Sequence, residues 1–423
     1  MRVMKWSMIA LAVAAGTSQL AVASSQEESK GFVEDSTLNV KTRAMYMNRD
    51  FKHGAGNSTS GTAGYREDSG VSLLGTFESG FTQGTVGVGV DAIAMGSARI
   101  DGGSGRRGNG LFANDSDGNP EKSQGKAGAA VKFRISDTVL KYGDQFVASP
   151  VFSTDDSRLM PEMTRGTLIT SKEISGLELS AGRFTSMSAQ TGMGHDSIAG
   201  KGEPGLTSAN IAGATYAFTD NFTGTLATSD VEDYFKKHYL NLNLTAPLGE
   251  KQSLNFDLNA YRTKDQGKEF AGPQDNKIWS LAAAYALEGH KFTLAYQRSS
   301  GDTGYYYGVD GGGTVFLANS IQISDFNGAE EKSWQARYDL NMASYGVPGL
   351  SFMTRYVKGD NIDTGAGEGK EHEWNLESKY VLQEGPAKDL SLRVRYAVYR
   401  ATDNYSVDNN DLRLIVEYPL SIL

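Results

Sequence analysis

Apolar and polar residues alternate along most of this chain, and this period of two restricts the fold more than any other feature. In an extended strand, successive side chains point to opposite faces, so one face meets apolar surroundings and the other meets water. Near the C-terminus, for example, Leu412, Leu414 and Val416 alternate with Arg413 and Glu417. The same alternation occurs in the segments 38–49, 131–135, 240–244, 254–259, 334–340, 374–380 and 392–399. The pattern predicts an all-β protein.

Two all-β architectures show this alternation. A soluble β-sandwich turns its apolar side chains inward, whereas a transmembrane barrel turns them towards lipid and leaves polar side chains around a wet lumen. The polar stripe is rich in charged residues, which suits a water-filled lumen. Aromatic residues lie near the ends of the alternating segments, as the interfacial girdles of a barrel require: Trp334, Tyr356, Trp374, Tyr380, Tyr399 and Tyr418. These two features favour a transmembrane antiparallel β-barrel.

The connectors between the alternating segments differ in length. The short ones resemble tight periplasmic turns: Ser136-Asp137, Ser175-Gly176, Thr219-Asp220-Asn221 and Glu288-Gly289. The long ones are rich in Gly, Asn and Asp and resemble extracellular loops: 102–126, 192–205, 299–313 and 359–370. This asymmetry is typical of outer-membrane barrels. With about 22 residues for each strand and its connector, the segment 24–423 predicts about 18 strands around an aqueous channel.

The first residues have the three parts of a secretory signal peptide. They are a basic start that includes Arg2, an apolar run over 8–15 and a cleavage site of small residues at 21–23. We therefore expect residues 1–23 to be removed. Because no Pro-rich or charge-rich linker divides residues 24–423, we expect them to form a single barrel domain.

The charge and the cysteine content exclude several functional classes. The chain has 41 Lys and Arg against 50 Asp and Glu, a net charge of -9, whereas nucleic-acid binders usually present a basic surface. It contains no Cys, which excludes disulfides and thiolate metal sites. Its five histidines have no metal-ligand spacing, and no HExxH motif occurs. We therefore expect no nucleic-acid partner, no metal and no cofactor.

Three local motifs resemble sites of other protein classes. Residues 103–108 match GxGxxG, but no helical periodicity follows, as a dinucleotide site would require. The segment 115–119 has calcium-ligand residues at alternate positions, yet its glycine falls at the fourth loop position instead of the sixth, and Lys126 stands where Glu is needed. A loop-bound cation remains an alternative there. The His-Asp-Ser cluster at 195–197 supports the alternative function, an outer-membrane barrel enzyme of the protease or lipase kind.

Basic residues lie on the polar stripe of a chain that is acidic overall. They are Lys41, Arg43, Lys132, Arg134, Lys141, Arg337, Arg355, Arg393, Arg395 and Arg413. If this stripe faces the lumen, Arg393, Arg395 and Arg413 lie on neighbouring strands and form a column. Two interpretations remain open: the guanidinium groups bind carboxylates of permeating solutes, or they pair with carboxylates of the wall. The candidates for such pairing are Glu373, Glu377, Asp257 and Glu417.

Several segments of the chain resemble the OprD (Occ) family of outer-membrane channels. The most specific is STDDSRLMP at 153–161, which is followed by GTLITSKE at 166–173. Further matches are GFVEDSTLN at 31–39, MTRYVKGDN at 353–361 and LRLIVEYPL at 412–420. The matching segments are spread over most of the chain.

The resemblance implies an 18-stranded antiparallel barrel in the outer membrane of a Gram-negative bacterium. It also implies an inward-folded constriction loop and a ladder of arginines on one wall. The implied substrate-binding residues are Arg158, Asp156, Arg393, Arg395, Arg413 and Arg43. The first two belong to the DDSR motif of the constriction loop, and the others lie on strands of the wall. In the constriction, Asp156 would either pair with Arg158 or contact a substrate amine.

The implied function is passive, selective uptake of small carboxylate-containing nutrients, with no covalent step. The family divides between basic amino acids and cyclic or aromatic acids, and the rather short loops of this chain favour the second group. The expected partners are the carboxylate solutes, outer-membrane lipid and lipopolysaccharide, with a monomer or a weak homo-oligomer as the assembly. In one departure, the chain ends in Ile422-Leu423, whereas many outer-membrane barrels end in Phe.

Overall fold

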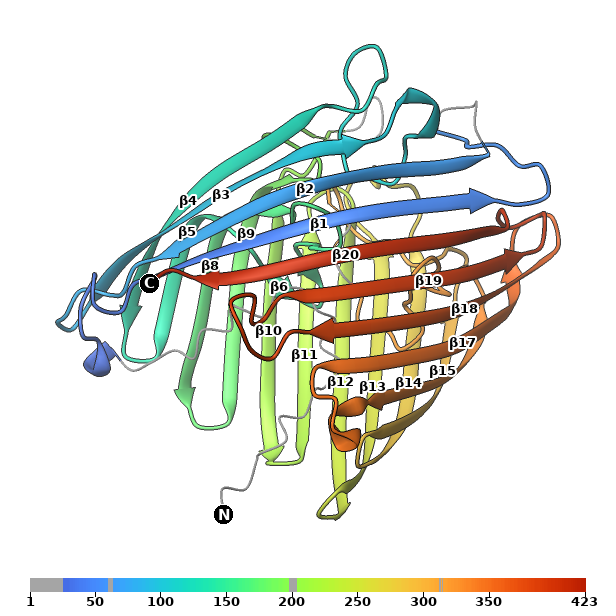
Figure 1. Cartoon of the computed structure of the whole chain (residues 1–423). Helices are drawn as coiled ribbons and strands as arrows, with labels where there is room; N and C mark the ends of the chain where they lie inside the picture. Colours follow the sequence, from blue (N-terminus) through green and yellow to red (C-terminus); the bar gives the residue numbers. More distant parts are fainter. Residues whose placement is uncertain (1–25, 60–63, 198–203, 312, 314) are drawn as a thin grey trace.

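The computed structural model describes residues 26–59, 64–197, 204–311, 313 and 315–423, which form almost only β-strands (Figure 1). Eighteen strands make one antiparallel sheet that closes on itself. It closes because β1 (Thr37–Phe51) pairs with both β2 (Tyr65–Glu78) and the last strand, β20 (Asn409–Ser421). In Figure 1, blue β1 accordingly lies beside red β20. The predicted barrel and its strand number are confirmed, whereas the predicted signal peptide, 1–23, lies outside the described residues.

The other barrel strands follow in chain order, each paired with the barrel strand before it and the one after it. They are β3 (Gly87–Asp101), β4 (Ser123–Ile135), β5 (Thr138–Gln145), β8 (Met163–Ile174), β9 (Leu177–Ser188), β10 (Ala209–Thr219), β11 (Phe222–Val231), β12 (Phe235–Gly249), β13 (Gln252–Asp265), β14 (Asp275–Leu287), β15 (His290–Ser300), β16 (Lys332–Asn341), β17 (Leu350–Asp363), β18 (Glu368–Val381) and β19 (Ser391–Ala401). A short hairpin of β6 (Ala148–Ser149) and β7 (Phe152–Ser153) belongs to the loop between β5 and β8.

Helical structure is limited to short 3-10 turns in the described ranges: η1 (Gln26–Glu28), η2 (Ser104–Arg106) and η3 (Met342–Tyr345). None of these is long and apolar enough to cross a membrane.

Apolar side chains lie on the outer face of the wall and polar ones on the lumen face, as the alternation in the sequence predicts. On β20, Leu414 and Val416 lie on the outer face and are 40% and 37% exposed, whereas Arg413 faces the lumen and is 5% exposed. Hydrocarbon offers no hydrogen bonds to the backbone, so a membrane-spanning sheet is stable only when every strand is paired on both edges. The β1–β20 pairing meets this requirement.

The connectors at the periplasmic end are not uniformly short. The predicted short turns are present at 136–137, 175–176 and 288–289, and the turn expected at 219–221 is the two-residue turn 220–221. The connectors 79–86, 342–349 and 382–390 at the same end are longer. The first of these packs against the N-terminal segment, where the Gln26 side chain donates to the carbonyls of Thr82 and Gly84 at 2.8 and 3.0 Å.

One predicted extracellular loop is mostly strand. The segment 359–370 was expected to be a long loop, but β17 extends to Asp363 and β18 begins at Glu368. Only residues 364–367 connect the two strands. Glycine in this segment belongs to an irregular strand end, where the register shifts between Gly359 and Ile362, rather than to an extended loop.

Candidate functional site

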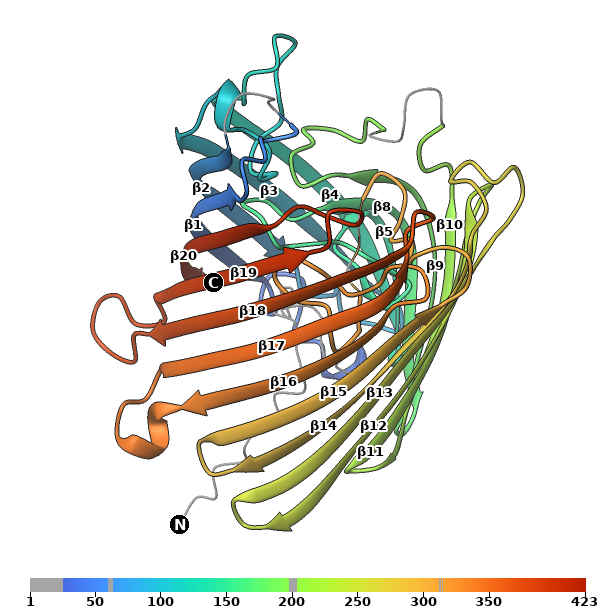
Figure 2. The same cartoon turned by 90° about the vertical axis from the view of Figure 1, so that its right-hand side faces the viewer.

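Two long loops, 146–162 and 301–331, fold from the extracellular end into the barrel, and Figure 2 shows loop segments inside the ring of strands. Both loops contribute side chains to one buried apolar cluster. Tyr261 of β13 links them, because its hydroxyl donates to the carbonyl of Pro150 at 3.1 Å and accepts from the backbone N–H of Phe316 at 3.1 Å. The two loops therefore meet in the lumen and narrow it.

Asp156 attaches the first inward loop to β1. Its carboxylate lies 2.7 Å from Lys41 Nζ and 2.7 Å from Arg43 Nη1. Arg43 also donates to the carbonyl of Arg158 and forms a 2.7 Å ion pair with Glu417 of β20. Asp156 therefore pairs with Arg43 and Lys41 and not with Arg158, which was one of its two expected contacts. Arg43, assigned above to the wall alone, anchors the loop.

The electrostatics of this anchor follow from its burial. Burial alone would raise the pKa of the Asp156 carboxyl, but the attraction and hydrogen bonds of Arg43 and Lys41 lower it below its ordinary value. The carboxylate is therefore charged at neutral pH, and the ion pair persists there.

Arg158 is oriented by a contact that the sequence did not predict. Its Nε donates to the carbonyl of Asn109, in the loop between β3 and β4, at 2.8 Å. Its Nη1 donates to Ser157 Oγ at 3.0 Å. The neighbouring residue Leu159 packs in a buried cluster with Met45 of β1. The DDSR motif is thus attached to both the wall and a second loop.

The three predicted ladder arginines lie side by side. Arg395 of β19 and Arg413 of β20 are directly opposite each other in the sheet. Glu377 of β18 lies 2.7 Å from Arg393 Nη2 and 3.2 Å from Arg395 Nε. Arg413 Nε lies 2.7 Å from Asp411. The predicted column is therefore present as a geometric arrangement.

The guanidinium groups of these strands outnumber the carboxylates that they contact. Glu377 is shared by Arg393 and Arg395, and Asp411 is shared by Arg413 and Arg49, the latter at 2.9 Å. Four guanidinium groups thus contact two carboxylates. Side chains of Arg393 and Arg395 keep 25% and 19% of their surface exposed, so solvent reaches them.

The basic wall continues onto β16 and β17. Arg337 and Arg355 are directly opposite each other. Arg337 pairs with Asp339 at 2.6 Å, whereas Arg355 donates to the amide oxygen of Asn375 at 2.6 Å. Arg355 is therefore bound by a neutral partner, which does not cancel its charge.

The proposed wall carboxylates divide into two groups. Glu377 and Glu417 pair with arginines, as one interpretation expected. Glu373 instead accepts hydrogen bonds from the backbone of Ile323 and Ser324, in the second inward loop, at 3.1 and 2.9 Å. Asp257 binds amide groups of neighbouring asparagines. Ion pairing therefore neutralises only part of the basic set.

Lys237 of β12 anchors the second inward loop from the opposite wall. Its side chain is 1% exposed. Its Nζ donates to the hydroxyl of Tyr305 at 2.9 Å and to the carbonyls of Tyr306 and Tyr307 at 2.9 and 2.8 Å. Together with the Glu373 contacts, this attachment stretches the loop across the lumen.

The inward course of this loop corrects a sequence prediction. The segment 299–313 was expected to be an extracellular loop, but the connector extends from 301 to 331 and enters the barrel. Its residues 305–307 are Tyr-Tyr-Tyr and 315–317 are Val-Phe-Leu. Such apolar runs inside a Gly-rich connector are the sequence signal that indicates a packed loop.

The other motifs have structural roles in the loops. Residues 103–108 include the short turn η2. Asp115 accepts from the backbone of Asn119 at 2.7 Å and closes a turn. Among the described residues, no group of three or more His, Asp or Glu is arranged to hold a metal. His195 Nε2 lies 3.1 Å from Asp144, while Ser197 donates to Asp310 at 2.7 Å, so the cluster at 195–197 binds two different acids.

A closed barrel of eighteen strands, narrowed by loops inside its lumen, defines a porin-type channel of the outer membrane. Residues 30–422 match the family model described as outer membrane porin, OprD family. The chain is 49% identical to Porin D of Pseudomonas aeruginosa over 456 aligned residues, with 100% of both proteins covered. It is 34% identical to the porin-like protein GalP of Pseudomonas putida, with 94% of this chain and 95% of the relative covered.

Solved structures agree with this match. OccK9 (OpdG) of Pseudomonas aeruginosa superposes with a TM-score of 0.87 at 31% identity, covering 93% of this chain and 100% of that one. OprD of the same organism gives a TM-score of 0.80 at 45% identity, covering 95% and 99%. The chain belongs to the OprD family of outer-membrane porins and forms a substrate-uptake channel in the outer membrane of a Gram-negative bacterium. The predicted family and location are confirmed.

Proposed function

We propose that this channel selects small carboxylate-containing nutrients by means of its arginine wall and passes them without chemical change. The supporting observation is the sharing of two carboxylates, Glu377 and Asp411, by four guanidinium groups. Two unit charges about 4 Å apart attract each other by about 1 kcal/mol in water and by about 4 kcal/mol near a protein surface. Such an attraction enriches anions in the pore and still allows their release.

The proposed path follows the order of the arginines along the wall. A solute carboxylate entering from the loop end meets Arg158 at the constriction and then Arg395, whose positive charge is reinforced by the buried Arg413 directly opposite. It next reaches Arg393, which lies closer to the periplasmic end of β19. A guanidinium group binds a carboxylate through two parallel hydrogen bonds, so at Arg395 and Arg393 the solute can exchange with Glu377. No bond of the solute is made or broken.

Cyclic or aromatic acids are the proposed substrate class. Asp156, which was the candidate for contacting a substrate amine, is already bound by Arg43 and Lys41, so the constriction offers less to a basic amino acid. The solved structure of Pseudomonas aeruginosa OpdK with vanillate, an aromatic carboxylate, superposes with a TM-score of 0.82 at 32% identity, covering 92% of this chain and 100% of that one. That relative supports the class without identifying the solute.

A liposome-swelling panel tests the proposal. We expect the wild-type channel to admit benzoate faster than arginine, and faster than neutral solutes of similar size. The double variant Arg395→Ala with Arg413→Ala, and separately Arg158→Ala, should slow benzoate entry while neutral solutes enter unchanged. Equal entry of benzoate in all three proteins would refute the arginine path, and faster entry of arginine than benzoate would refute the substrate class.

A further inference from the structure

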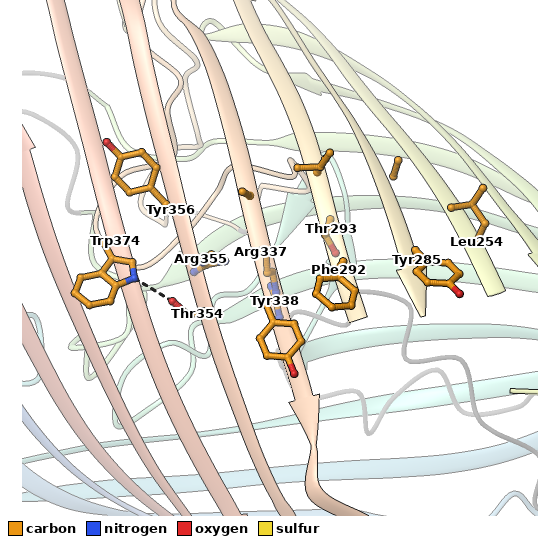
Figure 3. A pocket seen from close by; sticks show the side chains of 13 residues that line it. Leu254, Tyr285, Phe292, Thr293, Arg337, Tyr338, Thr354, Arg355, Tyr356 and Trp374 are labelled. Atoms are coloured by element: carbon orange, nitrogen blue, oxygen red, sulfur yellow. Dashed lines mark hydrogen bonds between the residues drawn. The ribbon is translucent and has the colours of Figure 1, made fainter. Parts of the chain in front are cut away.

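The outer face of the barrel has a hollow across β13 to β18. Its volume is about 590 Å³, which lies within the range of small-molecule sites. In Figure 3 the rings of Tyr285, Phe292 and Tyr338 stand on the near side of the strands, whereas Arg337 and Arg355 point behind them. The hollow therefore opens towards the lipid and not towards the lumen.

Small residues surrounded by large ones create this hollow. Ala336 lies directly between Leu294 of β15 and Tyr356 of β17 in the cross-strand row. Along its own strand, the next outward-facing side chains are Trp334 and Tyr338. A methyl group with large side chains on all four sides leaves a depression in the wall.

The polar atoms inside the hollow satisfy each other. Trp374 Nε1 donates to Thr354 Oγ1 at 3.0 Å across β17 and β18. In hydrocarbon an unpaired donor or acceptor is costly, so this bond leaves an apolar interior and holds the indole ring in place. The hollow thus offers a rigid, apolar surface to a flexible chain.

The hollow lies in the periplasmic half of the wall and ends at polar groups. Tyr285 is two residues from the end of β14, and Tyr338 is three residues from the end of β16, both at the periplasmic turns. The Tyr338 hydroxyl lies 2.8 Å from His290 Nδ1, and His290 Nε2 lies 2.8 Å from the hydroxyl of Tyr345. A ligand in this hollow is therefore apolar along the wall and polar at the turns.

We propose that this hollow is a binding site for one phospholipid of the periplasmic leaflet. An acyl chain lies over Ala336 and Thr354, and the headgroup lies beside His290 and Tyr345. The site is continuous with the membrane-facing wall, where acyl chains are the surrounding medium. Its position in the periplasmic half of the wall favours a phospholipid over lipopolysaccharide, which occupies the opposite leaflet.

A second copy of the chain is a poorer occupant. Stable protein interfaces bury well over about 1,000 Å² and involve roughly 20–30 residues on each side, whereas 13 residues line the hollow. A depression also lacks the protruding counterpart that a self-complementary contact between identical faces needs.

Native mass spectrometry of the purified channel with phosphatidylethanolamine tests the site. We expect wild-type protein to retain one tightly bound phospholipid and Ala336→Phe, which fills the hollow, to retain none. Ala127→Phe adds the same side chain to the outer face of β4, away from the hollow, and should retain the lipid. Photoactivatable phosphatidylethanolamine should label peptides from β14 and β17 in the wild-type protein, which provides a measurement that needs no variant.

Any of four outcomes would overturn the proposal. The first is equal lipid retention by Ala336→Phe and the wild type, both with normal conductance. The second is preferential retention of lipopolysaccharide, added in parallel, by the wild type but not by Ala336→Phe. The third is a dimer that dissociates in Ala336→Phe, because the hollow would then be an interface between copies. Labelling spread evenly over all strands would likewise exclude a specific site.

Discussion

The lumen walls formed by β12–β13 and by β18–β20 with β1 are both polar, but their carboxylates have different partners. On the first wall, Asn241 and Asn243 both donate to Asp257, at 2.9 and 2.8 Å, and Asn259 donates to the same carboxylate at 2.6 Å. One negative charge is thus enclosed by neutral amides. On the second wall, the carboxylates of Glu377 and Asp411 each contact two arginines.

This difference indicates that the amide wall is structural and that the arginine wall is the surface that selects solutes. The donors and acceptors of the amide network bind each other, so few of them remain for a passing solute. The arginine wall has more N–H donors than its carboxylates can accept. A solute anion can therefore accept the remaining hydrogen bonds. Solute selection is therefore expected to depend on the arginine side of the lumen. Both sides hold the inward loops in place, through Arg43 and Glu373 on the arginine side and through Lys237 on the other.

The largest expected effect comes from the anchor of the first inward loop. Removing one member of a buried ion pair costs about 3 kcal/mol or more, and the Arg43 side chain is only 7% exposed. We expect Arg43→Ala to release loop 146–162, raise the single-channel conductance and reduce discrimination between solutes. Planar-bilayer recordings measure both quantities.

Lys41→Ala is the matched control for this variant. Lys41 contacts the same carboxylate, but its side chain is 28% exposed, and exposed ion pairs are worth at most about 1 kcal/mol. Its conductance should stay close to that of the wild type. If both variants behaved alike, burial would not explain the anchor.

The next effect concerns the wall formed by β12 and β13. Lys237→Met removes the donor for the carbonyls of Tyr306 and Tyr307, and each buried acceptor left unpaired costs about 1–3 kcal/mol. We expect loop 301–331 to loosen and current fluctuations to become more frequent. Lys236→Met is the control, because that lysine is half exposed and pairs with Asp230 outside the lumen. A quiet Lys237→Met channel would contradict this anchoring role.

A direct test of the two walls compares Arg395→Ala with Asn243→Ala. Losing one guanidinium charge removes about 1 kcal/mol of attraction for an anion, which corresponds to about a fivefold change in relative anion permeability. Asn243→Ala removes an amide and should change it far less. Reversal potentials in a salt gradient report this ratio. Equal shifts of the reversal potential in the two variants would show that the two walls do not differ in anion selection.

The smallest effect is the pH dependence of the first anchor. The pKa of Asp156 is lower in the folded protein than its ordinary value of about 3.9, so the stabilisation is present above that value and is lost as the pH falls through the lower, folded pKa. Conductance should therefore stay constant from pH 7 to about 4 and rise only below that. Asp156→Asn should remove the acid-induced rise. A transition between pH 5 and 6 would show that another group controls the loop.

The sequence alone determined the barrel, its strand number and the direction of its side chains. Alternation is a local property: whether Leu414 or Arg413 faces lipid depends only on the strand around it and on the solvent on each side. The arginine column could be predicted for the same reason, since β19 and β20 are consecutive strands that pair in register.

Only the tertiary structure decided which loops enter the lumen and what they bind. Arg43 and Asp156 are separated by 113 residues, and Lys237 and Tyr305 by 68, so no periodicity or spacing relates them. The partner of a buried charge depends on which groups the closed barrel brings within hydrogen-bonding distance. Closure joins β1 to β20 across the whole length of the chain, and this contact, absent from any local pattern, places the constriction beside the arginine wall.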